Sequence, residues 1–189
     1  PEAREKLPSR GISDPETVIR RHIQLCYDVC HFSVEFEEGA GALNNIIQSN
    51  IPIGKVQISA ALKVVSPDET AYDLLAAFDE PTYLHQAVGK KEKALHKYRD
   101  LPQLLKEKPV LDEVRCHFHV PIFTPEFSGL QSTQEDIITL LRLCKDEPFT
   151  HHMEVETYTW QVLPAYLSQN MDEAIQRELA WVKEQWTEL

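Results

Sequence analysis

Several short apolar runs in this chain carry ionisable residues at alternate positions, and this pattern constrains the fold more than any other feature. Side chains of a strand alternate between its two faces, so Glu154 and Glu156 share one face of an expected strand. His117 and His119 share a face in the same way, and Asp28 ends a third apolar run. Ionisable groups in such places are costly to bury unless they are paired, hydrogen-bonded or bound to metal. The pattern therefore predicts strands that converge on one polar site.

Longer amphipathic segments separate the apolar runs, as in a chain built from βα units. Strands are predicted at Ile23–Tyr27, Lys55–Ala60, Tyr83–Gln86, Glu113–Ile122 and His152–Tyr158. Helices are predicted at Ala40–Ser49, Asp68–Phe78, Thr133–Cys144 and Met171–Glu188, with the end of another at Thr17–Arg21. Lys90–Lys108 is predicted as one or two helices or an insertion, and residues 1–15 as loop. This order favours a parallel sheet, whose functional groups collect at the carboxyl ends of the strands, where Asp28, His119 and Glu156 fall.

Length, charge and composition limit the classes of function that are expected for this chain. The 189 residues suit one ordinary domain, and the formal charge of −11, from 19 basic and 30 acidic residues, disfavours non-specific nucleic-acid binding. No run approaches the roughly 20 apolar residues that cross a bilayer, and no signal-peptide core is present, so a cytoplasmic protein is expected. The four cysteines lack zinc-ribbon spacing and are expected to be reduced and packed.

The clustered ionisable residues are of the types that bind divalent cations, which prefer carboxylate oxygen and imidazole nitrogen. The predicted metal ligands are Asp28, His117, His119, Glu154 and Glu156. Each also has a structural interpretation: a hydrogen-bonded histidine, an aspartate that caps a turn, or a glutamate paired with Arg115 or Lys55. The predicted substrate contacts are His31, Gln57 and Trp160. No glycine-rich phosphate loop and no nucleophile elbow are present.

Seven blocks of this sequence resemble the EboE family of metabolite traffic proteins. They are Cys26–His31, Val34–Glu37, Lys55–Leu62, Tyr83–Gln86, Tyr98–Pro102, His117–Pro121 and Glu154–Trp160, and the resemblance runs from about Arg20 to Val182. That family belongs to the xylose-isomerase-like TIM barrels, alongside sugar-phosphate isomerases and epimerases. The resemblance implies an α/β fold of the (β/α) barrel type. Because such a barrel needs eight strands, residues 1–189 would be its C-terminal half, with four to five strands.

The resemblance also implies roles for individual residues. Asp28 would ligate a metal ion and His31 would contact substrate, while Glu154 or, preferably, Glu156 would ligate the metal and act as acid and base. The sequence departs from the superfamily pattern at the strand Lys55–Ala60, which carries Gln57 where the superfamily has a metal-binding histidine. His117 or His119 would then take the place of that histidine as a metal ligand.

The leading functional hypothesis is a divalent-metal-dependent isomerase or epimerase, with Glu156 and His31 as catalytic residues. The metal would be Mn, Mg, Zn or Co, and the substrate a sugar-like or polyol molecule of a biosynthesis and export pathway. The alternatives are a metal-dependent hydrolase on the same barrel and a non-catalytic pathway or interaction protein with a degenerate metal site. The expected partners are a small-molecule substrate and other proteins of that pathway, with neither nucleic acid nor membrane. The sequence leaves open whether the chain is an enzyme at all.

Overall fold

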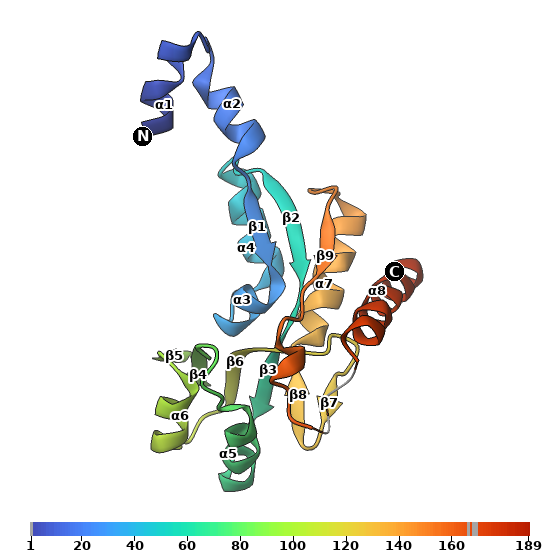
Figure 1. Cartoon of the computed structure of the whole chain (residues 1–189). Coiled ribbons are helices and arrows are strands. Elements are labelled where there is room, and N and C mark those ends of the chain that lie inside the picture. The colour runs from blue at the N-terminus through green and yellow to red at the C-terminus, as the bar shows by residue number, and fades with distance from the viewer. Residues whose placement is uncertain (1, 166, 168–169) are drawn as a thin grey trace.

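Two β-sheets organise the chain. The computed structural model describes residues 2–165, 167 and 170–189. Within them the strands form a three-stranded parallel sheet and a six-stranded antiparallel sheet. Figure 1 shows the parallel sheet in the upper part of the view and the antiparallel sheet below it, with β2 leading down into β3.

The parallel sheet has the order β1 (Leu25–Asp28), β2 (Ile53–Ile58) and β9 (Met153–Val155). The short helix α1 (Glu2–Lys6) and helix α2 (Pro15–His22) precede it. Two further helices, α3 (Val29–Val34) and α4 (Gly39–Gln48), connect β1 to β2. A crossover of this kind is what allows two consecutive strands to run parallel.

The antiparallel sheet has the order β5-β4-β6-β3-β8-β7. Its strands are β3 (Ala60–Val65), β4 (Ala87–Lys91), β5 (Ala94–Tyr98), β6 (Glu113–Val120), β7 (Glu126–Phe127) and β8 (Leu130–Ser132). Ser59 alone separates β2 from β3, so one run of extended chain belongs to both sheets. The two sheets therefore meet at Ser59.

The remaining helices lie beside the two sheets. They are α5 (Glu69–Leu75), α6 (Leu101–Glu107), α7 (Gln134–Asp146) and α8 (Met171–Glu188), with 3-10 turns at Pro8–Arg10, Ala76–Phe78 and Thr159–Gln161. Asp68, Asp100 and Asn170 cap three of them by accepting backbone N–H groups, which satisfies donors that have no partner inside the helix. One cluster of buried apolar residues runs from the parallel sheet, at Val56, to the antiparallel sheet, at Phe118.

The expected barrel half is wrong. The predicted strand Glu113–Ile122 forms β6, which pairs antiparallel with β3 and β4, and in the described residues only β1, β2 and β9 run parallel. The connection from β3 to β6 holds the β4–β5 hairpin, whose β4 pairs antiparallel with β6, in place of a single crossover helix. A barrel wall requires every strand to run the same way, so this sheet cannot continue the parallel one.

Three local predictions also differ from the structure. Residues 1–15 contain α1 and a 3-10 turn, and Tyr83–Gln86 forms no strand. The charged segment Lys90–Lys108 contains strand β5 and helix α6, and four of the five β5 residues are exposed. Exposed, lysine-bearing edge strands are common because charge discourages pairing with another chain.

Helix α8 buries a carboxyl group. Its expected apolar stripe is largely exposed at Ile175, Leu179 and Trp186, whereas Ala174 and Glu178 are buried. Glu178 accepts hydrogen bonds from the Ile122 N–H at 3.3 Å and the Thr157 hydroxyl at 2.7 Å. Burial raises the pKa of Glu178 to about 7 although both hydrogen bonds act to lower it.

In the described part of the chain, no helix is long and apolar enough to cross a membrane.

Replacing Glu178 with glutamine should stabilise the protein at alkaline pH. Because the folded state raises the pKa of this carboxyl from its ordinary value of 4.5 to about 7, its contribution is complete below about pH 4.5 and is lost as pH rises through 7. Above pH 7, Glu178→Gln should exceed the wild type in free energy of unfolding by on the order of 2–3 kcal/mol. Urea denaturation between pH 4 and 8.5 measures this difference. The exposed Glu184→Gln is the control, and parallel pH profiles for wild type and Glu178→Gln would contradict the assignment.

Candidate metal centre

The polar residues of three parallel strand ends meet where the two sheets join. Asp28 is the last residue of β1, Ser59 follows β2 directly, and Glu156 follows β9 directly. The carboxyl ends of neighbouring parallel strands lie at one edge of a sheet, which explains the convergence. Asp28 and Glu156 therefore lie at carboxyl ends of parallel strands, as predicted, whereas a function at this edge stays a prediction.

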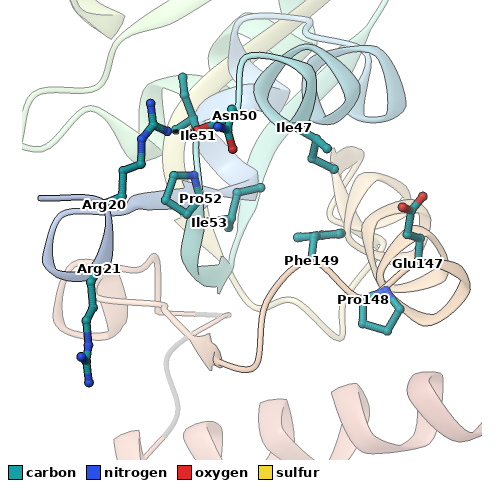
Figure 2. Close-up of a pocket in the computed structure, with 10 residues that line it drawn as sticks. All are labelled: Arg20, Arg21, Ile47, Asn50, Ile51, Pro52, Ile53, Glu147, Pro148 and Phe149. Carbon is teal, nitrogen blue, oxygen red and sulfur yellow. Dashed lines mark hydrogen bonds between the residues drawn. The ribbon is translucent and has the colours of Figure 1, made fainter. Parts of the chain in front are cut away.

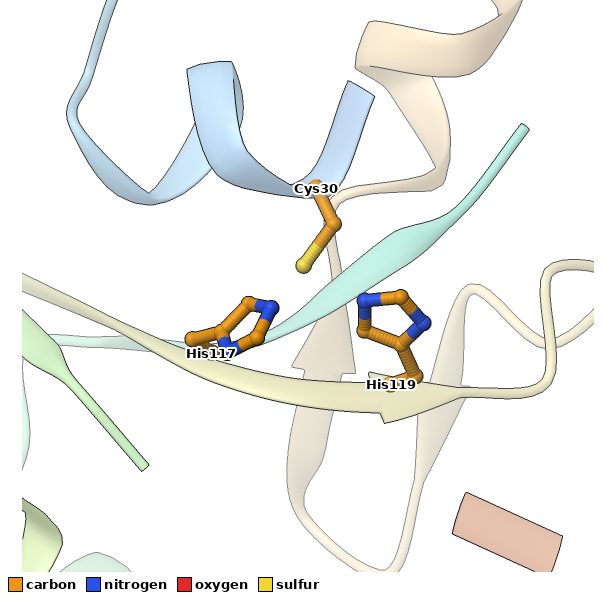
Figure 3. A group of neighbouring side chains, drawn as sticks. All are labelled: Cys30, His117 and His119. Carbon is orange, nitrogen blue, oxygen red and sulfur yellow. The ribbon is translucent and has the colours of Figure 1, made fainter. Parts of the chain in front are cut away.

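The two histidines come from the other sheet, through an irregularity in β6. In the pairing of β3 with β6, Ala61 lies opposite His119 but Leu62 lies opposite Cys116, so His117 and Phe118 are extra residues on β6. Such bulges bend a strand and redirect its side chains. Both imidazoles consequently lie on the side of β6 that faces α3, as Figure 3 shows.

Two groups of potential metal ligands share one imidazole. Cys30, His117 and His119 form the first group, and Asp28, His119 and Glu156 form the second. Within each group one ligand atom per residue lies within 4.8 Å of the others. Figure 3 shows the Cys30 thiol pointing from α3 towards the two imidazoles. The structure therefore contains a cluster of cysteine, histidine, aspartate and glutamate that could hold a metal ion.

Hydrogen bonds hold this cluster in place. His119 Nδ1 lies 2.7 Å from the backbone oxygen of Glu156, which can only accept, so Nδ1 carries the proton and Nε2 is left with its lone pair. This is the usual arrangement of a metal-binding histidine. The Ser59 hydroxyl donates to Asp28 Oδ1 at 2.6 Å and accepts from the Cys30 N–H at 3.0 Å. One serine at the sheet junction thus positions residues of both groups.

Three atoms of the cluster are buried without a hydrogen-bond partner among the described residues. They are Nε2 of His117, Nε2 of His119 and Oε2 of Glu156. Buried polar atoms usually have partners, because leaving one unsatisfied costs roughly 1–3 kcal/mol. All three atoms are of types that ligate metals, so the residues present fit a bound cation.

Burial and neighbouring charges shift the proton affinities of the cluster. Burial, together with the negative charge of Asp28, raises the pKa of Glu156 to about 7. Burial, followed by the positive charge that His119 and His31 would carry, lowers the pKa of His117 to about 4, and burial also lowers the pKa of His119. The imidazoles are therefore neutral near pH 7 and free to act as ligands.

The cluster is closed on the cysteine side and open on the carboxylate side. Cys30 and His119 have no exposed surface, whereas the Glu156 side chain is 30% exposed. His31 lies at the open side with 62% of its side chain exposed, and its Nε2 is 3.7 Å from Asp28 Oδ2. The Tyr158 ring covers His119, with 4.5 Å between ring centroids. His31 and Glu156 are thus residues of this region that solvent reaches.

The other predicted site residues lie apart from the cluster. Glu154 is half-exposed and forms an ion pair with Lys55. Gln57 accepts a hydrogen bond from the Cys26 thiol at 2.9 Å. Trp160 is 5% exposed and packs in the hydrophobic core, so Tyr158 is the aromatic residue beside the cluster.

Two residues of this site, Cys30 and Ser59, are not among the site residues predicted from the sequence. Cys30 is the second residue after Asp28, and Asp28 Oδ1 caps α3 by accepting the Cys30 N–H at 3.0 Å. The local sequence signal for Cys30 is its place in the first turn of a helix that directly follows the strand-end residue Asp28. Its proximity to the histidines of β6 depends on how α3 packs, which the sequence pattern does not show.

A separate cavity of about 500 Å³ lies at the amino ends of the parallel strands, beside Ile53 and Phe149 (Figure 2). It is lined by Arg20, Arg21, Ile47, Asn50, Ile51, Pro52, Ile53, Glu147, Pro148 and Phe149, which include no residue of the metal cluster. The cavity and the cluster are thus at opposite ends of β2.

No family model matches this chain, and no curated protein or solved structure matches it significantly. The resemblance to the EboE family therefore stays a prediction. What the site can do follows from its own geometry.

Removing the Ser59 hydroxyl should loosen the cluster. In Ser59→Ala, Asp28 Oδ1 loses a donor and the buried Cys30 N–H loses one of two acceptors, so the free energy of unfolding should fall by about 1–2 kcal/mol. Urea denaturation of the metal-free protein at pH 7 measures the loss. The exposed Ser49→Ala is the matched control and should change stability by less than about 0.5 kcal/mol. Equal stability of Ser59→Ala and wild type would contradict the role given to this hydroxyl.

Proposed function

We propose that this chain binds one divalent metal ion through Asp28, His119 and Glu156 and transfers a proton on a small hydroxylated substrate, as a sugar or polyol isomerase or epimerase does. The observation that carries the proposal is the meeting of these three ligand atoms, from three separate segments, within 4.8 Å of one another. The proposal rests on this cluster alone, since the part of the chain that the structure describes forms no barrel.

The unpartnered atoms support metal binding over a purely structural role. A structural cluster of buried polar groups would be expected to satisfy itself by internal hydrogen bonds. Here Glu156 Oε2 and the Nε2 atoms of both histidines have no such partner among the described residues. The like charges of Asp28 and Glu156 add to the cost of this arrangement, which a cation would offset.

The residues of the open side support proton transfer. A divalent ion, when bound, would polarise a carbonyl or hydroxyl oxygen of the substrate. The Glu156 carboxyl group is 30% exposed at this side, where it could take up and release a proton of the substrate. His31, exposed beside Asp28, is placed to hydrogen-bond substrate hydroxyls, and Tyr158 offers a ring face at the same side.

Metal binding should depend on Asp28 and Glu156 but not on Glu154. Asp28→Asn and Glu156→Gln should weaken Zn²⁺ or Mn²⁺ binding by roughly 100-fold, because loss of even an outer partner of a metal site costs 10- to 100-fold. Glu154→Gln is the matched control: it lies two residues away, is paired with Lys55, and should bind metal as the wild type does. Calorimetric titration of the metal-free proteins measures the affinities.

Two results would overturn metal binding through this cluster. One is a wild-type protein of intact circular dichroism that takes up neither ion. The other is an equal loss of affinity in Glu154→Gln and Glu156→Gln.

Isotope exchange should identify the reaction class. If Glu156 removes a proton from carbon, metal-loaded protein in D₂O should introduce deuterium at a C–H position of its substrate, and Glu156→Gln should not. Aldoses, ketoses, polyols and their phosphates form the panel, read by mass spectrometry.

The same incubation separates the remaining hypotheses. Bond cleavage by water without exchange would instead identify a hydrolase. Bound metal with neither activity would favour the non-catalytic hypothesis of an interaction protein. Pathway partners and a cytoplasmic location stay predictions.

A further inference from the structure

We propose that Cys30 is a ligand of this same metal centre and that its thiolate, with the imidazoles of His117 and His119, makes the centre selective for zinc over magnesium and manganese. This inference rests on the function proposed above and specifies the metal. Neither the alternating pattern of the strands nor the spacing of the four cysteines assigns this role to Cys30.

The position of the Cys30 thiol supports the assignment. Its sulfur, one nitrogen of His117 and one of His119 lie within 4.8 Å of one another, and Figure 3 shows the sulfur directed at both rings. In a tetrahedral zinc site, with bonds of about 2.0–2.3 Å, ligand atoms are roughly 3.3–3.8 Å apart. Closing the present group onto an ion thus requires shifts of about 1 Å, which side-chain rotation can supply.

The imidazoles provide an observation independent of the cysteine. Nε2 of His117 and Nε2 of His119 are buried and lack a hydrogen-bond partner in the described part of the chain. The His119 side chain is 1% exposed, and its Nδ1 is occupied by the Glu156 carbonyl. Its free nitrogen therefore lies inside the protein on the side of the Cys30 thiol, without a hydrogen-bond partner among the described residues.

The two groups of three describe one centre. They meet at His119, whose Nδ1 is hydrogen-bonded to the Glu156 backbone oxygen, so Nε2 is the one nitrogen of this ring left to ligate an ion. An ion at Nε2 would lie beside Cys30 and His117, and the Glu156 carboxylate is on the other side of the same ring, with Oε2 3.7 Å from Nδ1. Two ions could not share this one atom, so one ion is expected.

The donor set indicates the kind of metal. Thiolate and imidazole are the ligands of zinc, whereas magnesium and manganese prefer carboxylate, carbonyl and water oxygen. The thiols of Cys26 and Cys116 are less suited to this role, since each donates to an oxygen, of Gln57 and of the His85 backbone respectively. Among the four cysteines, Cys30 alone is in a group of potential ligands found in the described residues.

Cobalt substitution tests the thiolate directly. Co²⁺ replaces zinc in such sites, and a Co–thiolate bond produces an intense near-ultraviolet charge-transfer band that oxygen and nitrogen ligands do not. The whole chain, freed of metal, is titrated with Co²⁺ and then with Zn²⁺, Mg²⁺ and Mn²⁺ as competitors. Cys30→Ala is compared with Cys116→Ala, a matched control in which another fully buried thiol is removed from β6.

The expected result is a charge-transfer band in the wild type and in Cys116→Ala, absent in Cys30→Ala, with zinc affinity reduced roughly 100-fold in Cys30→Ala. Zinc should displace Co²⁺, whereas Mg²⁺ and Mn²⁺ in large excess should not. Zinc X-ray absorption of the wild type, which needs no variant, should show one sulfur neighbour at about 2.3 Å.

Each of the other possible results contradicts the inference, and each shows whether the proposed function fails with it. Wild-type protein that binds Co²⁺ without the band, or zinc without a sulfur neighbour, excludes Cys30 while leaving the proposed function intact. A band that persists in Cys30→Ala assigns the thiolate to another cysteine and refutes the proposal. Failure of the wild type to bind any of these ions refutes both the zinc centre and the function on which it rests.

Discussion

The passage of one extended segment through both sheets is the constraint on which the rest of this structure depends. β2 pairs in the parallel sheet, Ser59 follows, and β3 pairs in the antiparallel sheet without an intervening loop. A strand that changes sheets forces the carboxyl edge of the first sheet against the face of the second. The carboxylates of one sheet and the histidines of the other are therefore neighbours. Ser59, at the crossing point, bonds both the Asp28 carboxylate and the Cys30 backbone.

This junction has an energetic cost that the fold does not recover by itself. Two carboxyl groups lie together, two imidazoles are buried, and three of their atoms lack partners in the part of the chain that is described. Three other buried atoms of the described residues also lack a partner, namely Ser33 Oγ, Trp160 Nε1 and Glu178 Oε2, but at the junction the unpartnered atoms belong to a group of potential metal ligands, and broken local rules of this kind often mark function. The contrast with Glu178 is informative. That buried carboxyl also has a pKa of about 7 and one unpartnered oxygen, yet its other oxygen accepts two hydrogen bonds that anchor α8, and among the described residues it is in no group of potential metal ligands.

Much of the local structure could be predicted from the residues. The strands that end at Asp28 and that contain His117 and Glu154 are present with shifted ends, as are the helices over Ala40–Ser49 and Thr133–Cys144. The helix over Met171–Glu188 has the predicted bounds. The direction of pairing could not be predicted, because alternation along a strand is the same in parallel and antiparallel sheets until a partner is known. The expected barrel was wrong for this reason. Alternation also places Glu154 and Glu156 on the same face, so the sequence could not show which of them joins the cluster. In the structure only Glu154 has Lys55 as an ionic partner.

By itself, the sequence determined which residue types were available for a metal centre and that Asp28, His119 and Glu156 would stand at or near strand ends. These are consequences of local chemistry: alternation, capping and the cost of burying charge. Only the tertiary structure decided that the histidines belong to a different sheet from the carboxylates, that a bulge at His117 and Phe118 aims them, and that Cys30 joins them. Those outcomes depend on contacts between segments almost ninety residues apart, which no local pattern encodes.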